Sequence, residues 1–236
     1  MIRLVSAQLC CLSIVFVAFV TDAFAQVPPQ QELVQKAMRT VLALRAHREF
    51  SHFIALSEEA KAVVIIPEFI EAALLVGGAG GTAVLLAKDE NTGEWSYPAF
   101  YDVNMASVGL QAGGSISQVL LVFRTAEALE RLISMRTKLG VERNFVIGRR
   151  GERTEVGWLG NVGTDFFSFA LARGVFVGAA LEGAMFTPKH RWNHEYYGDK
   201  SLTPRDIVEK STVQNRGADG LRHALDRRGD DTKPEK

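Results

Sequence analysis

Residues 94–115 constrain the fold of this chain more than any other stretch. Its first half, Trp95 to Tyr101, is rich in aromatic residues, which suit a pleated and half-buried strand surface. Pro98 has no N–H to donate, so we expect this segment to be an edge strand or the start of a strand. The second half, Ser107 to Ser115, is rich in small residues, which let another backbone or a ligand approach a strand closely. Because the stretch carries no nucleophile, base or metal cluster, we interpret it as a packing centre.

The rest of the chain predicts an antiparallel architecture. Apolar, β-branched runs at 62–66, 82–87 and 117–124 predict buried strands, which Pro67, the glycines at 77–81 and the polar turn at 88–93 should end or interrupt. Helices are expected at 31–50, from Thr125 to Gly140 and from Thr203. Strands and helices do not alternate, which predicts an α+β class. We expect mainly antiparallel sheet or sandwich of short strands, with an N-terminal amphipathic helix and one or two packed helices.

The two ends of the chain differ in composition from its middle. Leu9 to Val20 is almost wholly apolar and Ala23-Phe24-Ala25 has the form of a cleavage site, so residues 1–25 are interpreted as a secretory signal peptide, with a retained anchor as the alternative. The mature protein is then expected to be periplasmic or secreted. Residues 26–56 are predicted to form an N-terminal helical segment of the domain, and 57–210 a β-rich domain. Residues 211–236 are highly charged and are predicted to be a disordered tail.

The predicted helix Gln31–Phe50 has an apolar half and a basic half. Its basic residues are Lys36, Arg39, Arg45 and Arg48, the last two near its C-terminal end, where cations also suit the helix dipole. One interpretation is a helix that covers the core with a solvated basic back. The other is a helix that lies on a membrane surface, because apolar and basic faces together are typical of one.

Three patterns in the sequence resemble chemical sites. Gly78 to Ala83 formally matches a dinucleotide fingerprint, but the helix that must follow it is missing, so no nucleotide cofactor is expected. His190 and His194 lie near Glu195 in what we predict to be a loop or hairpin without a third ligand, so no metal site is expected. Glu182 lies among apolar residues, where a carboxylate must be paired or form part of a pocket. A net charge of zero gives no indication of nucleic-acid binding.

Several short motifs together resemble the SYLF domain, also called the Ysc84-type or DUF500 domain, over roughly residues 57–208. They are the glycine-rich strand, Trp-Ser-x-Pro-x-Phe, Gly-x-Gln-x-Gly, Leu-Glu-Gly and Tyr-Tyr-Gly, which supply Gly78, Gly80, Trp95, Pro98, Phe100, Gly109, Gln111, Gly113, Gly183, Tyr197 and Gly198.

The resemblance implies an exported bacterial domain that binds phospholipid or a membrane surface without catalysis. We therefore expect Lys36, Arg39, Arg45, Arg48 and Glu182 to contact lipid. The alternative is a structural or protein-interaction domain of the cell envelope, and an enzyme of unknown type is a weaker one. Actin binding, as in eukaryotic relatives, is disfavoured by the predicted signal peptide.

Overall fold

A computed structural model describes residues 27–46, 59–134, 137–138, 166–172, 175–177, 181 and 184–226. Within these ranges the backbone alone is described at 73–76, 107–113, 137–138, 172 and 175–177. The predicted signal peptide, Arg48 and Glu182 lie outside the described residues.

Two long antiparallel strands, β1 (Ala62–Ala87) and β2 (Ala99–Phe123), form the centre of a six-stranded sheet. β2 also pairs with β4 (Phe166–Ala172) and with β6 (Met185–Pro188), and these two strands pair in turn with β5 (Val175–Val177) and β3 (Thr137–Lys138). The predicted α+β class and antiparallel sheet are therefore confirmed, but the two central strands are not short.

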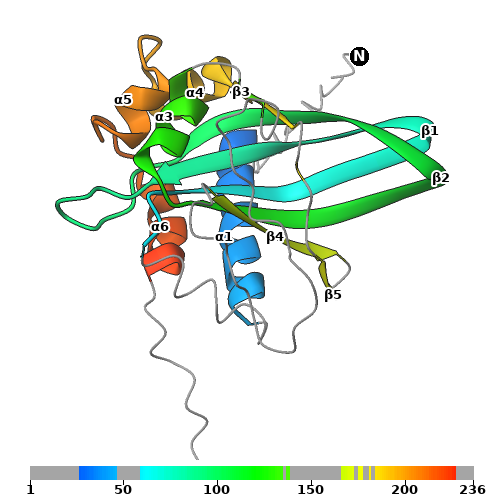
Figure 1. Ribbon diagram of the computed structural model, residues 1–236. Coiled ribbons are helices and arrows are strands. Elements are labelled where there is room, and N and C mark those ends of the chain that lie inside the picture. Colours follow the sequence, from blue (N-terminus) through cyan, green and yellow to red (C-terminus); the bar gives the residue numbers. More distant parts are fainter. Residues whose placement is uncertain are drawn as a thin grey trace, which may run out of the picture.

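Both long strands turn back on themselves at the same end of the sheet (Figure 1). The two halves of β1 lie against each other. Next to the two ends of the strand, the backbone N–H of Lys88 donates to the Lys61 carbonyl over 2.8 Å. A Cβ placed on Gly81 would stand only 2.4 Å from the Glu68 carbonyl oxygen, so a side chain here would force the two halves apart. This is the tight sheet packing that the glycine-rich segment predicts.

Pro67 and the glycines at 77–81 do not end the strand, which corrects the expected boundaries. Pro67 lies at a register shift between Ile66 and Phe69, where a bulge accommodates a residue without an N–H. The glycines continue the ladder with β2, from Gly77 opposite Ser107 to Gly81 opposite Val103. The strand runs on from these glycines to Ala87, so the helix that a dinucleotide fingerprint requires does not follow them.

Helices cover both faces of the sheet, which explains why its strands are nearly continuous apolar runs. Val64 and Ile66 belong to a core that includes α3 (Ala126–Ser134) and α5 (Pro204–Val208). Val63 and Ile65 belong to a second core, beneath α1 (Pro29–Arg45) and α6 (Asp219–Asp226). The structure has more short helices than the one or two expected.

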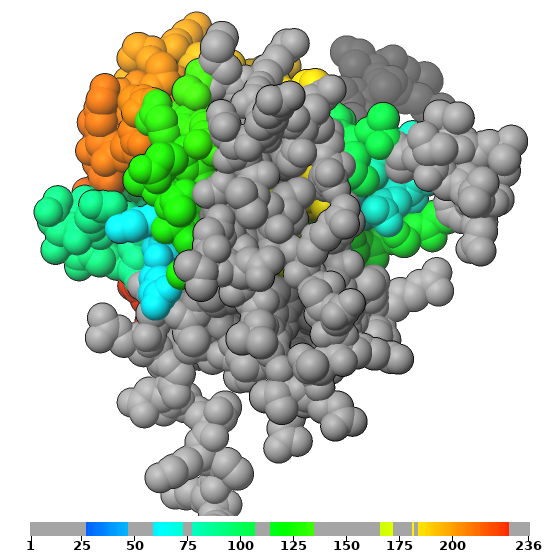
Figure 2. Space-filling view, in the orientation of Figure 1, coloured from blue at the N-terminus to red at the C-terminus, as the bar shows by residue number. Residues whose placement is uncertain are grey.

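Two helix starts follow the predicted capping chemistry. The Thr125 hydroxyl accepts from the Ala128 N–H at the start of α3, and Thr203 and Asp206 form a reciprocal capping box at the start of α5. Figure 2 shows α3 and α5 side by side on the surface, where Arg205 of α5 pairs with Glu130 of α3.

Two segments differ from the prediction. Residues 190–197 are a helix, α4 (His190–Tyr197), rather than a loop or hairpin; Gly198, at φ 73°, ends it in the left-handed conformation that glycine tolerates. Residues 211–226 are not a disordered tail. They contain η2 (Arg216–Ala218) and α6, whose Leu221, Ala224 and Leu225 are buried against α1.

Candidate functional site: a groove beside helix α1

Helix α1 lies with its apolar side on the sheet. Pro28 and Pro29 start it, since proline lacks an N–H that the first turn cannot use. Val34, Ala37, Val41 and Leu44 are buried in the core, so this face is unavailable to a membrane. Of the two interpretations of this helix, the contacts favour a core-covering helix with a solvated basic back.

The predicted cations of α1 have different surroundings. The Lys36 ammonium forms ion pairs with Glu32 and with Glu68 of β1, each over 3.1 Å. These two carboxylates, Glu68 first, raise the pKa of Lys36, which is therefore a cation at neutral pH. The Arg45 guanidinium donates to the Leu225 carbonyl over 2.8 Å and so holds α6. Arg39 is exposed, and it has no ion pair or hydrogen bond with any residue that the structure describes.

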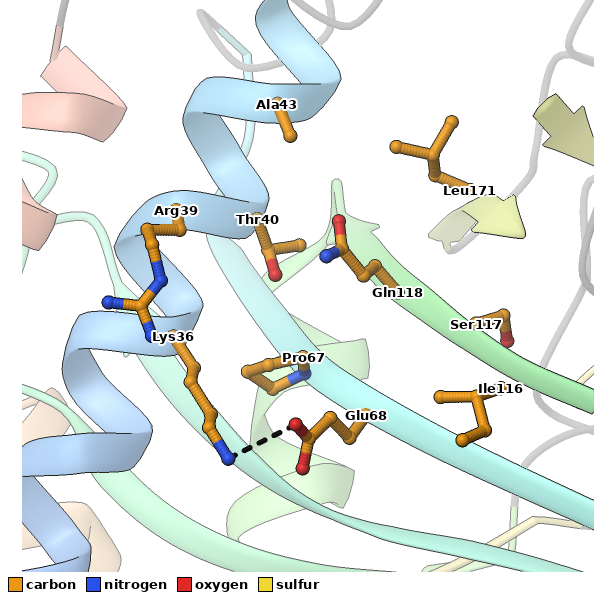
Figure 3. A pocket seen from close by; sticks show the side chains of 10 residues that line it. All are labelled: Lys36, Arg39, Thr40, Ala43, Pro67, Glu68, Ile116, Ser117, Gln118 and Leu171. Atoms are coloured by element: carbon orange, nitrogen blue, oxygen red, sulfur yellow. Dashed lines mark ion pairs between the residues drawn. The ribbon is translucent and has the colours of Figure 1, made fainter. Parts of the chain in front are cut away.

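A pocket of 440 Å³ opens between α1 and the sheet (Figure 3). Its lining comes from four elements: Lys36, Arg39, Thr40 and Ala43 of α1, Pro67 and Glu68 of β1, Ile116, Ser117 and Gln118 of β2, and Leu171 of β4. A second hollow of 300 Å³ continues toward the N-terminus of α1, past Leu33, Ile70 and Trp192. Lys36 and Glu68 line both, so their ion pair stands where the two hollows meet. We call the two hollows together the α1 groove.

The α1 groove combines exposed apolar side chains with a cationic rim. Ile70 and Ile116 face each other across the β1–β2 ladder and are 52% and 60% exposed, so together they form an exposed apolar patch. The side chain of Arg39 lies at the rim and is turned away from Gln118 (Figure 3). An amphiphile with an anionic group would match this arrangement of charge and apolar surface.

Two polar atoms in the wall of the pocket have no partner. Thr40, on the sheet side of α1, is completely buried, and its hydroxyl oxygen has no hydrogen bond with any described residue. The same holds for the side-chain carbonyl oxygen of Gln118. In Figure 3 the two side chains lie on facing walls, Thr40 on α1 and Gln118 on β2, with the nitrogen of the Gln118 amide on the side of Thr40. Since buried polar atoms in folded proteins are nearly always hydrogen-bonded, this pair calls for a ligand or a water.

A second group of polar side chains lies at one end of the sheet, and these side chains are hydrogen-bonded within the protein. The Asn193 side chain, buried in α4, accepts from the Phe100 N–H over 2.7 Å. The Tyr197 hydroxyl donates to the Pro98 carbonyl over 2.7 Å, and the Tyr97 hydroxyl donates to Asp219 of α6 over 2.9 Å. These residues belong to a cluster that we call the motif junction. It consists of Trp95, Tyr97, Pro98, Phe100, Asn193, Tyr196, Tyr197, Asp219 and Arg222.

The remaining contacts of the motif junction join it to the helices. The Arg222 guanidinium donates to the Trp95 carbonyl over 2.6 Å and lies over the Tyr97 ring. The Tyr196 hydroxyl donates to Gln31 of α1 over 3.0 Å. Trp95 is 2% exposed and Phe100 is completely buried, and Pro98 directly precedes β2, as a strand-start proline should.

Comparison with known proteins identifies the chain. Residues 104–228 match the family model Ysc84, described as Las17-binding protein actin regulator. The chain belongs to the Ysc84 family.

Curated relatives of this Ysc84-family chain come from fungi and animals. It is 26% identical over 166 residues to "SH3 domain-containing protein PJ696.02" of Schizosaccharomyces pombe, which covers 69% of the chain and 38% of the relative. It is 26% identical over 181 residues to human "SH3 domain-containing YSC84-like protein 1", covering 75% of the chain and 50% of the relative. For "Protein YSC84" of Saccharomyces cerevisiae the identity is 25% over 174 residues, covering 72% and 36%. The chain thus spans half or less of the length of these relatives.

The motif residues of this Ysc84-family domain lie in separate places. The junction contains Trp95, Pro98, Phe100 and Tyr197, with Gly198 next to it. Gly78 and Gly80 lie in β1, and a Cβ on Gly80 would come within 3.0 Å of the Val103 carbonyl oxygen. Gly109, Gln111 and Gly113 lie in β2, where only the backbone is described, and Gly183 lies outside the described residues.

The histidine pair carries no metal site within the described ranges. His190 and His194 share a face of α4, with ring centroids 6.1 Å apart, but a ring nitrogen of His194 lies 3.2 Å from the Leu202 carbonyl. Among the described residues no group of three His, Cys, Asp or Glu side chains is placed to hold a metal ion. In the same ranges, every helix is too short or too polar to cross a bilayer.

Sequence reasoning found Lys36 and Arg39 but missed four other lining residues of the groove: Thr40 of α1 and, on the opposite wall, Glu68, Ile116 and Gln118. The sequence features that could have indicated these lining residues are weak. Thr40 interrupts the apolar side of a helix, and Gln118 interrupts an apolar strand. Either residue alone is common in proteins, and only the fold brings the two together.

Proposed function

We propose that this Ysc84-family domain is an exported, non-catalytic lipid-binding protein that associates with anionic membrane surfaces through the α1 groove. The observation that carries the proposal is the groove's composition: Arg39 without a partner among the described residues, Lys36 beside it, and exposed Ile70 and Ile116 next to both. Each cation near an anionic surface contributes about 1 kcal/mol. The family's association with lipid, expected from the sequence motifs, supports the same conclusion.

The mode of contact differs from an inserted amphipathic helix. Since the apolar side of α1 is occupied by the core, the helix meets headgroups with Lys36 and Arg39, while Leu42, 40% exposed, and the two isoleucines supply the apolar contact. Arg45 holds α6 and is a poor target for mutation, because its loss would also disturb the fold.

Vesicle co-sedimentation tests the proposal. The purified chain is expected to sediment with vesicles of phosphatidylglycerol and phosphatidylcholine, and to do so less at 1 M salt, where the Debye length is about 3 Å. The double variant Lys36→Gln/Arg39→Gln should lose most of this binding. Lys200→Gln/Lys210→Gln removes the same charge away from α1 and serves as the matched control. Equal binding by both variants would show that the groove is not the contact surface.

Export is tested separately. We propose cleavage after Ala25, so N-terminal sequencing of the exported protein should begin at Gln26. A sequence that begins anywhere before Phe24 would contradict this.

The family description favours a second candidate, a domain that interacts with another protein. Because the matched model is described as an actin regulator, co-sedimentation with filamentous actin is the direct test. Binding to actin without binding to any vesicle would favour this candidate over the lipid-binding one.

A further inference from the structure

The pocket between α1 and β2 offers more than a charged rim, because it is large enough to enclose part of a ligand. Its 440 Å³ lies at the small end of the range of roughly 300–1,000 Å³ that is typical of ligand sites. Ala43, Pro67, Ile116 and Leu171 provide apolar wall, and Lys36, Arg39 and Glu68 are its charged lining among the described residues. This composition suits one acyl chain rather than the two of a membrane phospholipid.

The two unpartnered atoms specify a polar group on that ligand. The Gln118 carbonyl oxygen can only accept a hydrogen bond, so the ligand must bring a donor to it. The Thr40 hydroxyl can donate as well as accept. Both oxygens are closed to solvent in this structure, so the Gln118 amide has to turn before a ligand hydroxyl can donate to its oxygen and accept from Thr40. A fatty-acid carboxylate has no donor to offer and would place negative charge against the Gln118 oxygen.

We propose that the pocket binds one molecule of a single-chain phospholipid with a free glycerol hydroxyl. The hydroxyl binds Thr40 and Gln118, the acyl chain lies along Pro67, Ile116 and Leu171, and the phosphate meets Arg39 and Lys36 at the rim. This inference rests on the proposed lipid binding and deepens it, since it replaces a general attraction to anionic surfaces with a stoichiometric site.

Calorimetric titration with short-chain 1-acyl lysophosphatidic acid, below its micelle concentration, tests the site. The purified chain should bind one equivalent. The 2-deoxy analogue, which lacks only the hydroxyl, should bind roughly tenfold more weakly, the loss expected for hydrogen bonds to buried partners. A fatty acid of the same chain length should also bind more weakly, and glycerol 3-phosphate, which has no acyl chain, should not bind measurably. Equal affinity for lysophosphatidic acid and its deoxy analogue would overturn the proposal without any mutation.

Protein variants provide the matching half of the experiment. Thr40→Val keeps the shape of the side chain and removes the hydroxyl, so it should weaken lysophosphatidic acid binding about tenfold and leave the affinity for the deoxy analogue unchanged. Thr40→Ser should restore the difference between the two lipids. Thr212→Val, which removes an exposed hydroxyl on the α5 side, is the control and should not affect binding. If Thr40→Val and wild type discriminate the two lipids equally, Thr40 binds water rather than lipid and the proposal fails.

Vesicle binding separates failure of this inference from failure of the proposed function. A chain that sediments with anionic vesicles but does not bind lysophosphatidic acid retains the surface association and overturns the pocket. A chain that binds neither overturns both.

Discussion

In the motif junction, the side chains of Tyr97, Asn193, Tyr196, Tyr197 and Arg222 all form hydrogen bonds to other elements. In the α1 groove, Thr40 and Gln118 each present a buried oxygen without a partner among the described residues, and Arg39 is unpaired there too. Both regions border α1, so the difference does not come from a lack of neighbouring structure. Polar groups that stabilise a fold are satisfied within it, whereas those that serve a ligand remain available until it binds.

The residues that identify the family and the residues proposed to bind lipid therefore lie in different regions. Most motif residues that the structure describes, such as Trp95, Pro98 and Tyr197, either belong to the junction or pack the sheet. Apart from Gly81 of the glycine-rich strand, the groove is lined by residues that belong to no motif. The motifs therefore identify the family, and the lipid-binding hypothesis has to be examined at different residues.

The largest effect is expected from Trp95→Ala in the junction. Trp95 is buried, and truncating a buried aromatic residue of this size costs about 3–5 kcal/mol of unfolding free energy. Chemical denaturation measures this loss, with Val27→Ala, an exposed residue before α1, as the control. A Trp95→Ala variant that is as stable as wild type but no longer binds lipid would instead make Trp95 part of the site.

A smaller loss is expected from Asn193→Ala. The change leaves the buried N–H of Phe100 without an acceptor, which costs about 1–3 kcal/mol. Asn91→Ala is a suitable control, because Asn91 is exposed in the turn after β1 and only its backbone N–H is hydrogen-bonded there. Equal stability of the two variants would mean that the junction does not depend on this bridge between α4 and β2.

Substitutions in the groove should weaken lipid binding but hardly change stability. Lys36→Gln/Arg39→Gln is expected to change the unfolding free energy by no more than about 0.5 kcal/mol, since the Lys36–Glu68 pair is partly exposed to solvent. The same variant should nevertheless lose vesicle binding. A large loss of stability would contradict the distinction between the two regions and would make Lys36 a structural residue.

The junction tyrosines stay protonated at neutral pH, so their ionisation does not change stability there. Titration to alkaline pH is therefore the most selective measurement of their burial. Burial, followed by the hydrogen bond to Asp219, raises the pKa of Tyr97, and burial is also the main cause of the raised pKa of Tyr196 and of Tyr197. A raised pKa favours the neutral phenol in the folded state, so this contribution is complete below the unfolded value of about 10 and is lost as the pH rises beyond it.

Ultraviolet absorbance of tyrosinate reports on this transition separately from Lys36, whose pKa is also raised. Ionisation should be delayed above pH 10 and should coincide with unfolding. Tyr197→Phe should remove part of the delayed signal. Ionisation of Tyr97, Tyr196 and Tyr197 near their ordinary pKa in a folded chain would contradict the buried junction.

The sequence predicted those parts of the fold that depend on local chemistry. The apolar runs of β1 and β2, the Thr203 capping box and the strand start after Pro98 all follow from neighbouring residues. The signals that failed were local as well. Pro67 and the glycines at 77–81 usually break strands, but here a bulge accommodates the first, and the close passage of Glu68 explains the glycine at 81.

Contacts between distant segments could not be predicted in the same way. Leu221, Ala224 and Leu225 form too short a stripe to indicate a helix in a charged sequence, and they are buried only because α1 covers them. For the groove, the sequence supplied Lys36 and Arg39 from the character of one helix. Gln118 could not be associated with Thr40, because the pairing depends on how α1 lies across the sheet.

The contact between α1 and α6 has a consequence for biosynthesis. Gln31 donates to the Gly217 carbonyl and Arg45 to that of Leu225, so the first described helix is held by segments made 186 and 180 residues later. At ordinary rates of translation, roughly 5–20 residues per second, α1 waits about 10–40 s for these partners. Throughout that interval its apolar side has only an incomplete core to cover. A chaperone that recognises amphipathic helices would have its best opportunity to bind the nascent chain at this stage.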